Sequence, residues 1–386
     1  MTATASVLAS TIAVLGTVDS TNTLVAHAIA SSRYSDARDR VEHLFEGGGS
    51  AAEGGTGPVP VSGTLGIAYD SSRKEASQAS GTVASNEGRT ASKDDRRRSG
   101  AGDCPVPFSV AVSDVQTQCR GRLGRAWYNR PGQSLLASWA FAVPTGLAED
   151  EARGGWLTMA AGLAVIAALR EVLAEEGSSP VNNDPAGQDA DDGLRLKWPN
   201  DVFCRGRKLA GILNEYVPVD EDWSALVVGV GLNLFVPAGD LPTDLSTSLQ
   251  LLFAPLAPYG QLRDRLVEAV GAHLSQELSP LIAQTAPGGA GASGGEDAFE
   301  ALRRRVLEVS WTLGRDVRVR PVSGPEFTGR ALAINPDASL QVLLPDGSQL
   351  AVTTGDVGVL PSVGPGAESP DGKGQVCDGG TANRSD

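Results

Sequence analysis

The segment Gln116-Thr117-Gln118-Cys119-Arg120-Gly121-Arg122-Leu123-Gly124-Arg125-Ala126-Trp127 decides where the strands of this fold must break. It separates two apolar stretches, residues 108–115 and 134–143, that have the composition of β-strands. Guanidinium groups at this density repel one another unless an anion lies between them, and glycine lets a backbone approach a ligand closely. The segment, called the Arg/Gly loop below, is therefore predicted to be either a solvated connection or an anion-binding loop.

Working outward from this loop, the apolar pattern predicts an α/β fold of the α+β type, with a mixed sheet flanked by helices. Further strands are expected over residues 10–18, 194–198, 202–204, 208–216 and 226–234, and helices over residues 23–31, 155–175, 259–277 and 297–310. Asp19-Ser20-Thr21-Asn22 supplies the capping residues for the first helix. Five short segments then follow, over residues 315–320, 328–334, 340–344, 349–353 and 357–360, and they predict a small β-barrel.

Changes in composition divide the chain of 386 residues into four parts. Residues 1–282 are expected to form the main domain, with flexible Gly/Ser-rich and polar insertions at about residues 47–106 and 177–193. A linker and a helix follow over residues 283–311. The small β-domain spans residues 312–362, and the low-complexity tail, residues 363–386, is expected to be disordered.

Charge and cysteine content limit the class of protein. The net charge of −14 argues against sequence-independent binding to nucleic acid, which needs a basic surface. The four cysteines and three histidines show neither metal-ligand spacing nor the density of a disulfide framework. The N-terminal segment lacks the basic start of a signal peptide, and the apolar stretch at residues 155–169 is too short to cross a bilayer comfortably. We expect a soluble, cytoplasmic protein.

Lysine use is selective in this chain, which has five lysines and 27 arginines. Lys74, Lys93 and Lys373 fall in the segments expected to be disordered, so Lys197 and Lys208 are the lysines of the folded body. A compact ammonium group is thus expected to matter at these two positions.

Four further motifs accompany the Arg/Gly loop. They are Asp19-Ser20-Thr21-Asn22, Lys197-Trp198-Pro199-Asn200-Asp201, Lys208-Leu209-Ala210-Gly211-Ile212-Leu213 and Gly229-Val230-Gly231-Leu232-Asn233-Leu234. In this order they resemble biotin–protein ligases. The resemblance implies a class II synthetase-like mixed sheet and an SH3-like C-terminal barrel. It also implies activation of biotin by ATP and Mg²⁺ to biotinyl-5′-AMP, and transfer of biotin to a lysine of a biotin carboxyl carrier protein.

The resemblance also assigns residues to roles. Arg120, Arg122 and Lys208 are expected to be catalytic. Biotin would be bound by Ser20, Thr21, Asn22, Gln116, Arg120, Gly121, Arg122, Lys208, Gly211 and Ile212. ATP would be bound by Arg122, Arg125, Trp127, Lys197, Asn200 and Asn233. The ligands of Mg²⁺ are unknown, with Asp201 a weak candidate. Helix capping, hairpin geometry and core packing remain alternative explanations for several of these residues.

The chain departs from the family pattern at Cys119, where the family has glycine. If this position requires a positive φ, cysteine strains the loop. A second reading makes Cys119 a reactive thiol whose pKa is lowered by the arginines. Too few residues precede Asp19 for the DNA-binding domain of the family's repressors, so repressor activity is not expected.

Two other functions stay open at this point. One is a lipoate/octanoate–protein ligase or transferase, which shares the catalytic fold. The other is a catalytically weak homologue that only binds biotin or a carrier. The sequence also leaves open a homodimer and the identity of the carboxylase subunit that accepts biotin.

Overall fold

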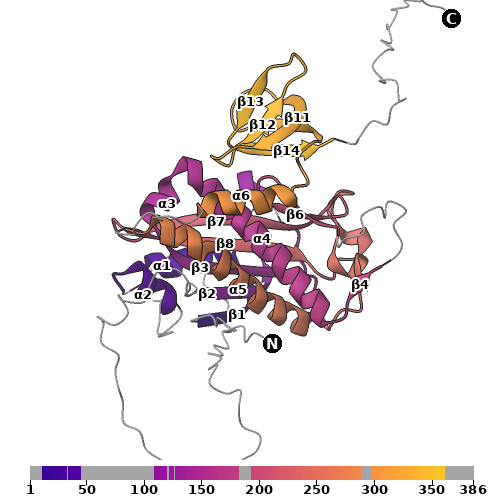
Figure 1. Ribbon diagram of the computed structural model, residues 1–386. Coiled ribbons are helices and arrows are strands. Elements are labelled where there is room, and N and C mark those ends of the chain that lie inside the picture. Colours follow the sequence, from indigo (N-terminus) through magenta and orange to yellow (C-terminus); the bar gives the residue numbers. More distant parts are fainter. Residues whose placement is uncertain are drawn as a thin grey trace, which may run out of the picture.

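The computed structural model describes residues 11–32, 34–44, 108–119, 121–125, 127–181, 193–287 and 297–360 (Figure 1). The predicted insertion at residues 47–106 and the predicted tail at 363–386 lie outside these residues, as do residues 182–192 of the second insertion. The described start of that insertion holds β4 (Ser179–Pro180), which pairs with β9 (Phe253–Ala254).

A seven-stranded sheet forms the centre of the main domain, in the order β1-β2-β3-β8-β7-β6-β5. Its strands are β1 (Thr11–Val18), β2 (Ser109–Gln116), β3 (Ser134–Pro144), β5 (Leu194–Lys197), β6 (Asp201–Cys204), β7 (Arg207–Pro218) and β8 (Trp223–Asn233). The β1–β2 pair is parallel and the other pairs are antiparallel, so the predicted mixed sheet is confirmed. Arg205 and Gly206, both with positive φ, close the predicted β6–β7 hairpin.

Helices cover both faces of this sheet. On one face lie α4 (Glu151–Glu175) and α5 (Tyr259–Thr285), with α6 (Ala298–Glu308) beside them, as Figure 1 shows. On the other face lie α1 (Thr21–Ala30) and α2 (Ala37–Glu42). Strand alternation separates the two layers: Val110 and Val112 pack in the cluster that contains α4 and α5, whereas Ala111 packs with α1 and α2. The short helix α3 (Thr145–Glu149) and α2 were not predicted.

Helix α4 is longer than the apolar stretch seen in the sequence. Its 25 residues are apolar enough to cross a membrane by length and composition, which corrects the expectation that this stretch is too short. However, 72% of its most apolar window is buried inside the molecule. It packs against α5 and the sheet, as the core helix of a folded domain does.

The C-terminal residues form a second, five-stranded antiparallel sheet in the order β13-β12-β11-β10-β14. Its strands are β10 (Asp316–Pro321), β11 (Phe327–Ile334), β12 (Leu340–Leu343), β13 (Gln349–Val352) and β14 (Gly355–Val359). All five predicted strands are present, but the closed barrel is not confirmed, because the described edge strands β13 and β14 do not pair with each other.

Two buried tryptophans of the main domain hold the C-terminal sheet in place. Trp156 Nε1 donates a hydrogen bond of 2.7 Å to the Pro336 carbonyl, and Trp198 Nε1 donates one of 2.9 Å to the Ala338 carbonyl. Both indoles are almost fully buried, so each hydrogen bond is shielded from water. The C-terminal sheet is thereby positioned above the end of the main sheet that carries β5 and β6 (Figure 1).

Candidate functional site

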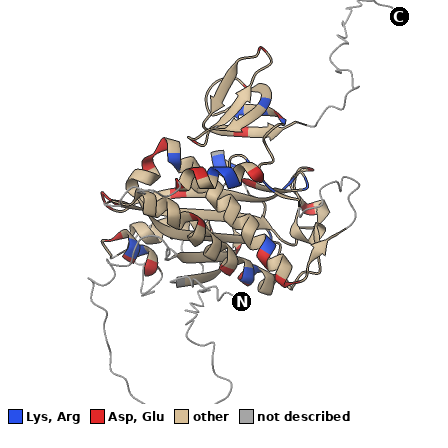
Figure 2. Ribbon diagram, in the orientation of Figure 1, with Lys and Arg blue, Asp and Glu red and all other residues tan. Residues whose placement is uncertain are grey.

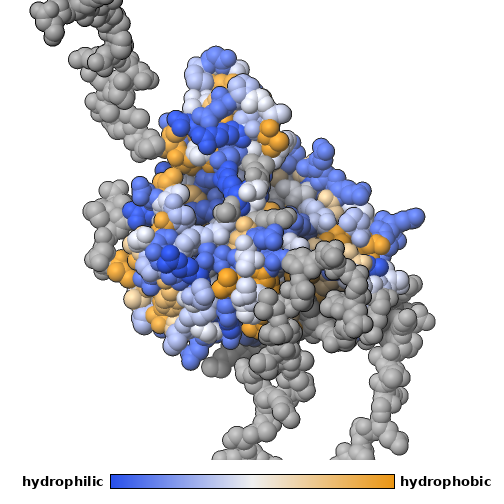
Figure 3. All heavy atoms as spheres, turned by 180° about the vertical axis from the view of Figure 1, so that it is seen from behind, coloured by the Kyte–Doolittle hydropathy of each residue, from blue (hydrophilic) through white to orange (hydrophobic). Residues whose placement is uncertain are grey.

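A cleft opens on the α1 side of the main sheet, the side of the molecule that Figure 3 shows. Fourteen of the predicted site residues line it: Ser20, Thr21, Asn22, Gln116, Gly121, Arg122, Arg125, Trp127, Lys197, Asn200, Asp201, Lys208, Gly211 and Ile212. Asn233 lines an adjoining cavity, which shares Trp127, Lys197 and Lys208 with the cleft. Arg120 lies outside the described residues.

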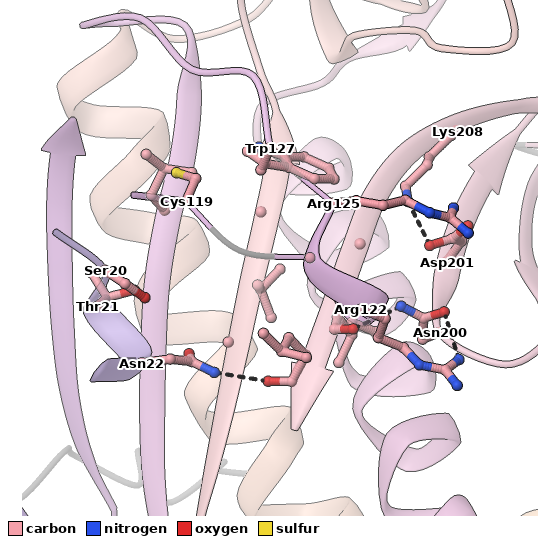
Figure 4. A pocket seen from close by; sticks show the side chains of 18 of the residues that line it. Ser20, Thr21, Asn22, Cys119, Arg122, Arg125, Trp127, Asn200, Asp201 and Lys208 are labelled. Atoms are coloured by element: carbon pink, nitrogen blue, oxygen red, sulfur yellow. Dashed lines mark hydrogen bonds and ion pairs between the residues drawn. The ribbon is translucent and has the colours of Figure 1, made fainter. Parts of the chain in front are cut away.

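One end of the cleft carries uncharged polar groups at the start of α1. Ser20, one of the four predicted capping residues, is the N-cap of this helix and accepts a hydrogen bond from the Thr23 amide at 3.5 Å. The helix begins at Thr21, two residues before the predicted start. Thr21 and Asn22 follow in the first turn, and both are buried. Gln116, at the end of β2, donates from Nε2 to Thr21 Oγ1 at 3.1 Å. Figure 4 shows these α1 residues on one side of the pocket.

Three glycines make room on the floor of the cleft. Gly231 on β8 lies opposite Gly211 on β7, and a Cβ atom at either position would come within 2.9 Å of the Trp127 ring. A Cβ at Gly229 would overlap the Asn22 amide. The Gly-Val-Gly segment is a buried strand, as predicted. Its glycines admit Trp127 and Asn22, which the sequence did not reveal.

The other end of the cleft is cationic. Asp201 forms an ion pair with Lys208 Nζ at 2.7 Å and a second with Lys197 Nζ at 3.4 Å. The side chains of Asp201 and Lys197 are only 12% and 10% exposed. The backbone of Lys208 is fixed by hydrogen bonds with Leu245 and Thr247. The two lysines singled out by composition therefore meet at one carboxylate.

This arrangement does not fit Asp201 as a magnesium ligand. Each of its oxygens already faces an ammonium group, and the described residues hold no cluster of three His, Cys, Asp or Glu that could bind a metal ion. A magnesium ion bound there would lie beside two ammonium groups that repel it.

The Arg/Gly loop is held by hydrogen bonds to residues far away in the sequence. Arg122 donates to Asn200 Oδ1 at 3.3 Å and to Thr354 Oγ1 at 3.2 Å. Asn200 in turn donates to the Ile212 carbonyl at 2.8 Å. Burial lowers the pKa of Arg122, with Asp201 opposing that shift, and the guanidinium stays charged.

The C-terminal sheet completes the wall of the cleft, which the sequence did not predict. Gly355 and Asp356 line the cleft, and Asp356 forms an ion pair of 2.7 Å with Arg125. Burial would raise the pKa of Asp356, but the hydrogen bond and charge of Arg125 bring it below its ordinary value. Thr354 and Asp356 thus connect β14 and the turn before it to the Arg/Gly loop.

The structure supports neither reading of Cys119. Its φ is not among the positive values in the described backbone, so cysteine causes no strain there. Burial raises the pKa of its thiol to about 11, the opposite of an activated nucleophile. Instead, the sulfur accepts a hydrogen bond from Asn129 Nδ2 at 3.2 Å. Asn129 also bonds both backbone groups of Gln116, at 3.0 Å each, and so closes the base of the loop.

The cleft concentrates positive charge in a chain whose net charge is −14. Arg122, Arg125, Lys197 and Lys208 face two carboxylates, those of Asp201 and Asp356. Elsewhere along the ribbon, acidic and basic residues are interspersed, as Figure 2 shows. A ligand with a neutral polar head and an anionic tail would match the two ends of this cleft.

Comparison with known proteins gives the family. The sequence profile of the biotin/lipoate A/B protein ligase family matches residues 107–233. The biotin–acetyl-CoA-carboxylase ligase of Mycobacterium tuberculosis is 31% identical over 248 residues, which cover 64% of this chain and 77% of that protein. The bifunctional ligase/repressor of Escherichia coli is 31% identical over 125 residues, 32% of each chain.

Among solved structures, the biotin protein ligase from Aquifex aeolicus in complex with biotin and ATP is 22% identical, with a TM-score of 0.45. That alignment covers 66% of this chain and 89% of the other. The relative from M. tuberculosis decides the assignment, because its identity of 31% extends over 77% of its length. The chain therefore belongs to the biotin–protein ligase family.

Proposed function

We propose that this protein is an ATP-dependent ligase that activates biotin as biotinyl-5′-AMP and transfers it to a lysine of a biotin carboxyl carrier protein. The observation that carries the proposal is the cleft itself, in which uncharged hydrogen-bonding groups at one end face a cationic cluster at the other. Biotin has a cyclic urea at one end and a carboxylate at the other. Family membership supports the same reaction.

In the first step, a carboxylate oxygen of biotin attacks the α-phosphorus of ATP. The bond from that phosphorus to the bridging oxygen of the β-phosphate breaks, and pyrophosphate leaves. Two anions must approach each other, so catalysis consists mainly of positioning and charge neutralisation. We assign this role to Arg122 and Lys208, together with Arg120. Each charge-assisted contact contributes on the order of 1.5–3 kcal/mol.

Asp201 has a supporting role in this proposal. It holds the ammonium groups of Lys208 and Lys197 at one point of the cleft. Biotin would be held by Ser20, Thr21, Asn22, Gln116, Gly121, Gly211 and Ile212. The nucleotide would contact Arg125, Trp127, Lys197, Asn200 and Asn233, with Mg²⁺ entering as the counterion of ATP rather than through Asp201.

In the second step, the amine of the carrier lysine attacks the acyl carbon of biotinyl-5′-AMP. The carbon–oxygen bond to the phosphate breaks, AMP leaves, and an amide bond forms. The reaction needs no nucleophilic side chain from the enzyme, which agrees with the raised pKa of Cys119. The first step needs ATP and the second needs the carrier, and we propose that the protein meets both in the cytoplasm.

We also propose a division of labour along the chain. Residues 1–282 would form the catalytic domain, residues 283–311 would connect it to the C-terminal domain, and residues 312–362 would form an SH3-like domain. The support for the last part is a set of five short antiparallel strands that reach the cleft through Thr354 and Asp356.

Biotin-dependent exchange of label between pyrophosphate and ATP tests the first step of the proposal. Transfer of biotin to a purified biotin carboxyl carrier domain tests the second. Lys208→Ala should lower kcat/KM for exchange by about tenfold to a hundredfold, since one charge-assisted contact is lost. Arg207→Ala is the matched control, because Arg207 is the exposed neighbour on the same strand. Exchange that depends on lipoate or octanoate instead of biotin would favour the alternative ligase, and no exchange would favour a binding protein.

A further inference from the structure

Ser138 and Glu215 lie behind the neutral end of the cleft, and neither was signalled by the sequence. We infer that they are positioning residues: together they fix the direction of a hydrogen-bond chain that presents Gln116 to the ligand as an acceptor. The inference rests on the proposed function for the identity of the ligand. The hydrogen-bond chain itself joins protein side chains only and does not depend on which ligand binds.

The chain begins at Asn22, which is 5% exposed. Its Nδ2 donates to Glu215 Oε2 at 2.7 Å and to the Leu213 carbonyl at 3.1 Å. Its Oδ1 lies 2.5 Å from Ser138 Oγ. Ser138 lies opposite Gly229 in the sheet, the glycine that makes room for this amide. Asn22 is therefore held by hydrogen bonds from β3 and β7, in the space that Gly229 of β8 leaves.

Two acceptors fix which way the Asn22 amide points. A carboxylate and a carbonyl can only accept, so both protons of Nδ2 are engaged and Oδ1 must face Ser138. Since Oδ1 can only accept, Ser138 gives its single proton to Asn22. The charged acceptor, Glu215, makes the shorter of the two Nδ2 bonds and contributes the stronger one.

The donor direction set at Asn22 then determines the direction of the next hydrogen bonds, which lead through Thr21 to Gln116 at the cleft. Ser138 Oγ also lies 2.6 Å from Thr21 Oγ1. Because the Ser138 proton is already used, the Thr21 hydroxyl donates across this contact, and its oxygen accepts from Gln116 Nε2 at 3.1 Å. Gln116 thus has its amide nitrogen turned toward Thr21. Its Oε1 is left as an acceptor at the wall of the cleft.

A carbonyl acceptor at this end selects a ligand with an N–H donor. The ring N–H of a cyclic urea supplies one, whereas the dithiolane of lipoate and the alkyl chain of octanoate do not. The hydrogen-bond chain would therefore contribute to the choice of biotin over these acids. Lipoate or octanoate would leave Gln116 Oε1 unpaired on binding, and an unpaired acceptor is costly. Glu215 and Ser138 would act through Asn22 and Thr21 without touching the ligand.

Ser138→Ala is the main test, because it removes one hydroxyl oxygen and keeps the Cβ. It should raise the Kd for biotin by about tenfold, as expected for a hydrogen-bond network left incomplete, and change the KM for ATP less than about twofold. Ser224→Ala is the matched control: Ser224 is a buried serine on β8 whose hydroxyl bonds Thr145 at 2.9 Å, away from the cleft. The two variants should lose similar amounts of thermal stability.

Glu215→Ala should also weaken biotin binding, whereas Glu215→Gln, which keeps an acceptor oxygen, should recover most of it. Glu221→Ala is the control for loss of an exposed carboxylate on the loop that follows β7. Because Ser138 and Glu215 act through one chain, Ser138→Ala combined with Glu215→Ala should cost less than the product of the two single losses. Unchanged biotin Kd in both single variants would overturn the inference.

Selective ¹⁵N labelling of Asn and Gln side chains gives a readout that does not need biotin. The side-chain amide resonances of Asn22 and Gln116 should both shift in Glu215→Ala, although Gln116 does not contact Glu215. A shift at Asn22 alone would contradict a directed chain. If the wild-type protein bound no biotin, the proposed function would fail, while this measurement would still decide whether the chain exists.

Discussion

Arg125 of the Arg/Gly loop lies 2.7 Å from Asp356 of β14, so the C-terminal sheet holds the loop that borders the cleft. Both residues line the cleft, and Thr354 makes a parallel contact with Arg122. The pair is partly exposed, with 56% of the Arg125 side chain and 29% of the Asp356 side chain open to solvent. Its role is therefore to order the loop, since exposed ion pairs add little to global stability.

Asp356→Asn should weaken retention of the adenylate by up to about fivefold while lowering stability by less than about 1 kcal/mol. Dissociation of the adenylate and chemical unfolding measure the two effects. Asp240→Asn is a close control, because it breaks the Arg130–Asp240 pair, whose side chains are 59% and 31% exposed. Equal retention in the two variants would mean that the contact with the C-terminal sheet is incidental.

The pH dependence of this contact follows from the lowered pKa of Asp356. A carboxyl group whose folded pKa is depressed stabilises the fold above its unfolded value, which is about 3.9 for Asp. That contribution is lost as the pH falls through the lower folded value. Adenylate retention should therefore not depend on Asp356 ionisation between pH 5 and 8, and a change centred near neutral pH would point to another group.

Gly231→Ala should displace Trp127, because the added Cβ would lie 2.6 Å from the indole. Overpacking of this kind costs about 1–3 kcal/mol, and the KM for ATP should rise along with it. Gly16→Ala is the control, since a Cβ at that β1 position meets nothing within 4 Å. An unchanged KM for ATP in Gly231→Ala would remove Trp127 from the nucleotide site.

Much of the fold could be predicted from local patterns. Apolar runs and turn residues predicted where the strands lie along the chain. Residues 19–22 were recognisable as a helix cap, because capping depends on neighbours in the sequence. Fourteen predicted residues line one cleft, since their motifs fall just after β1, at the end of β2, in the Arg/Gly loop, at the β5–β6 turn and along β7. The roles of these residues remain predictions.

The contacts that complete the site could not be predicted, because they join residues far apart in sequence. Thr354 is 232 positions from Arg122, and nothing in the two residues between β13 and β14 marks it in the sequence as a partner of that arginine. Ser138 reads as one residue of a buried strand, and Glu215 reads as an exposed one. Their significance comes from the register of β3, β7 and β8.

Asp201→Asn should lower the free energy of unfolding by about 3 kcal/mol, because it leaves the buried ammonium of Lys197 without its counter-charge. Urea unfolding measures this loss. Adding Lys197→Met should restore part of it, since the uncompensated charge is then removed. The loss should be the same with and without Mg²⁺. A stability loss that appears only when Mg²⁺ is present would instead support Asp201 as a metal ligand.

Cys119 should react slowly with iodoacetamide. With a pKa of about 11, only about one thiol in a thousand is ionised at pH 8, compared with about a quarter for an ordinary thiol. Peptide mapping by mass spectrometry follows this cysteine separately, with the fully buried Cys204 as an unreactive reference. The rate at Cys119 should rise about tenfold per pH unit up to about pH 10. Rapid labelling that is already constant at pH 7 would show that the arginines activate the thiol after all.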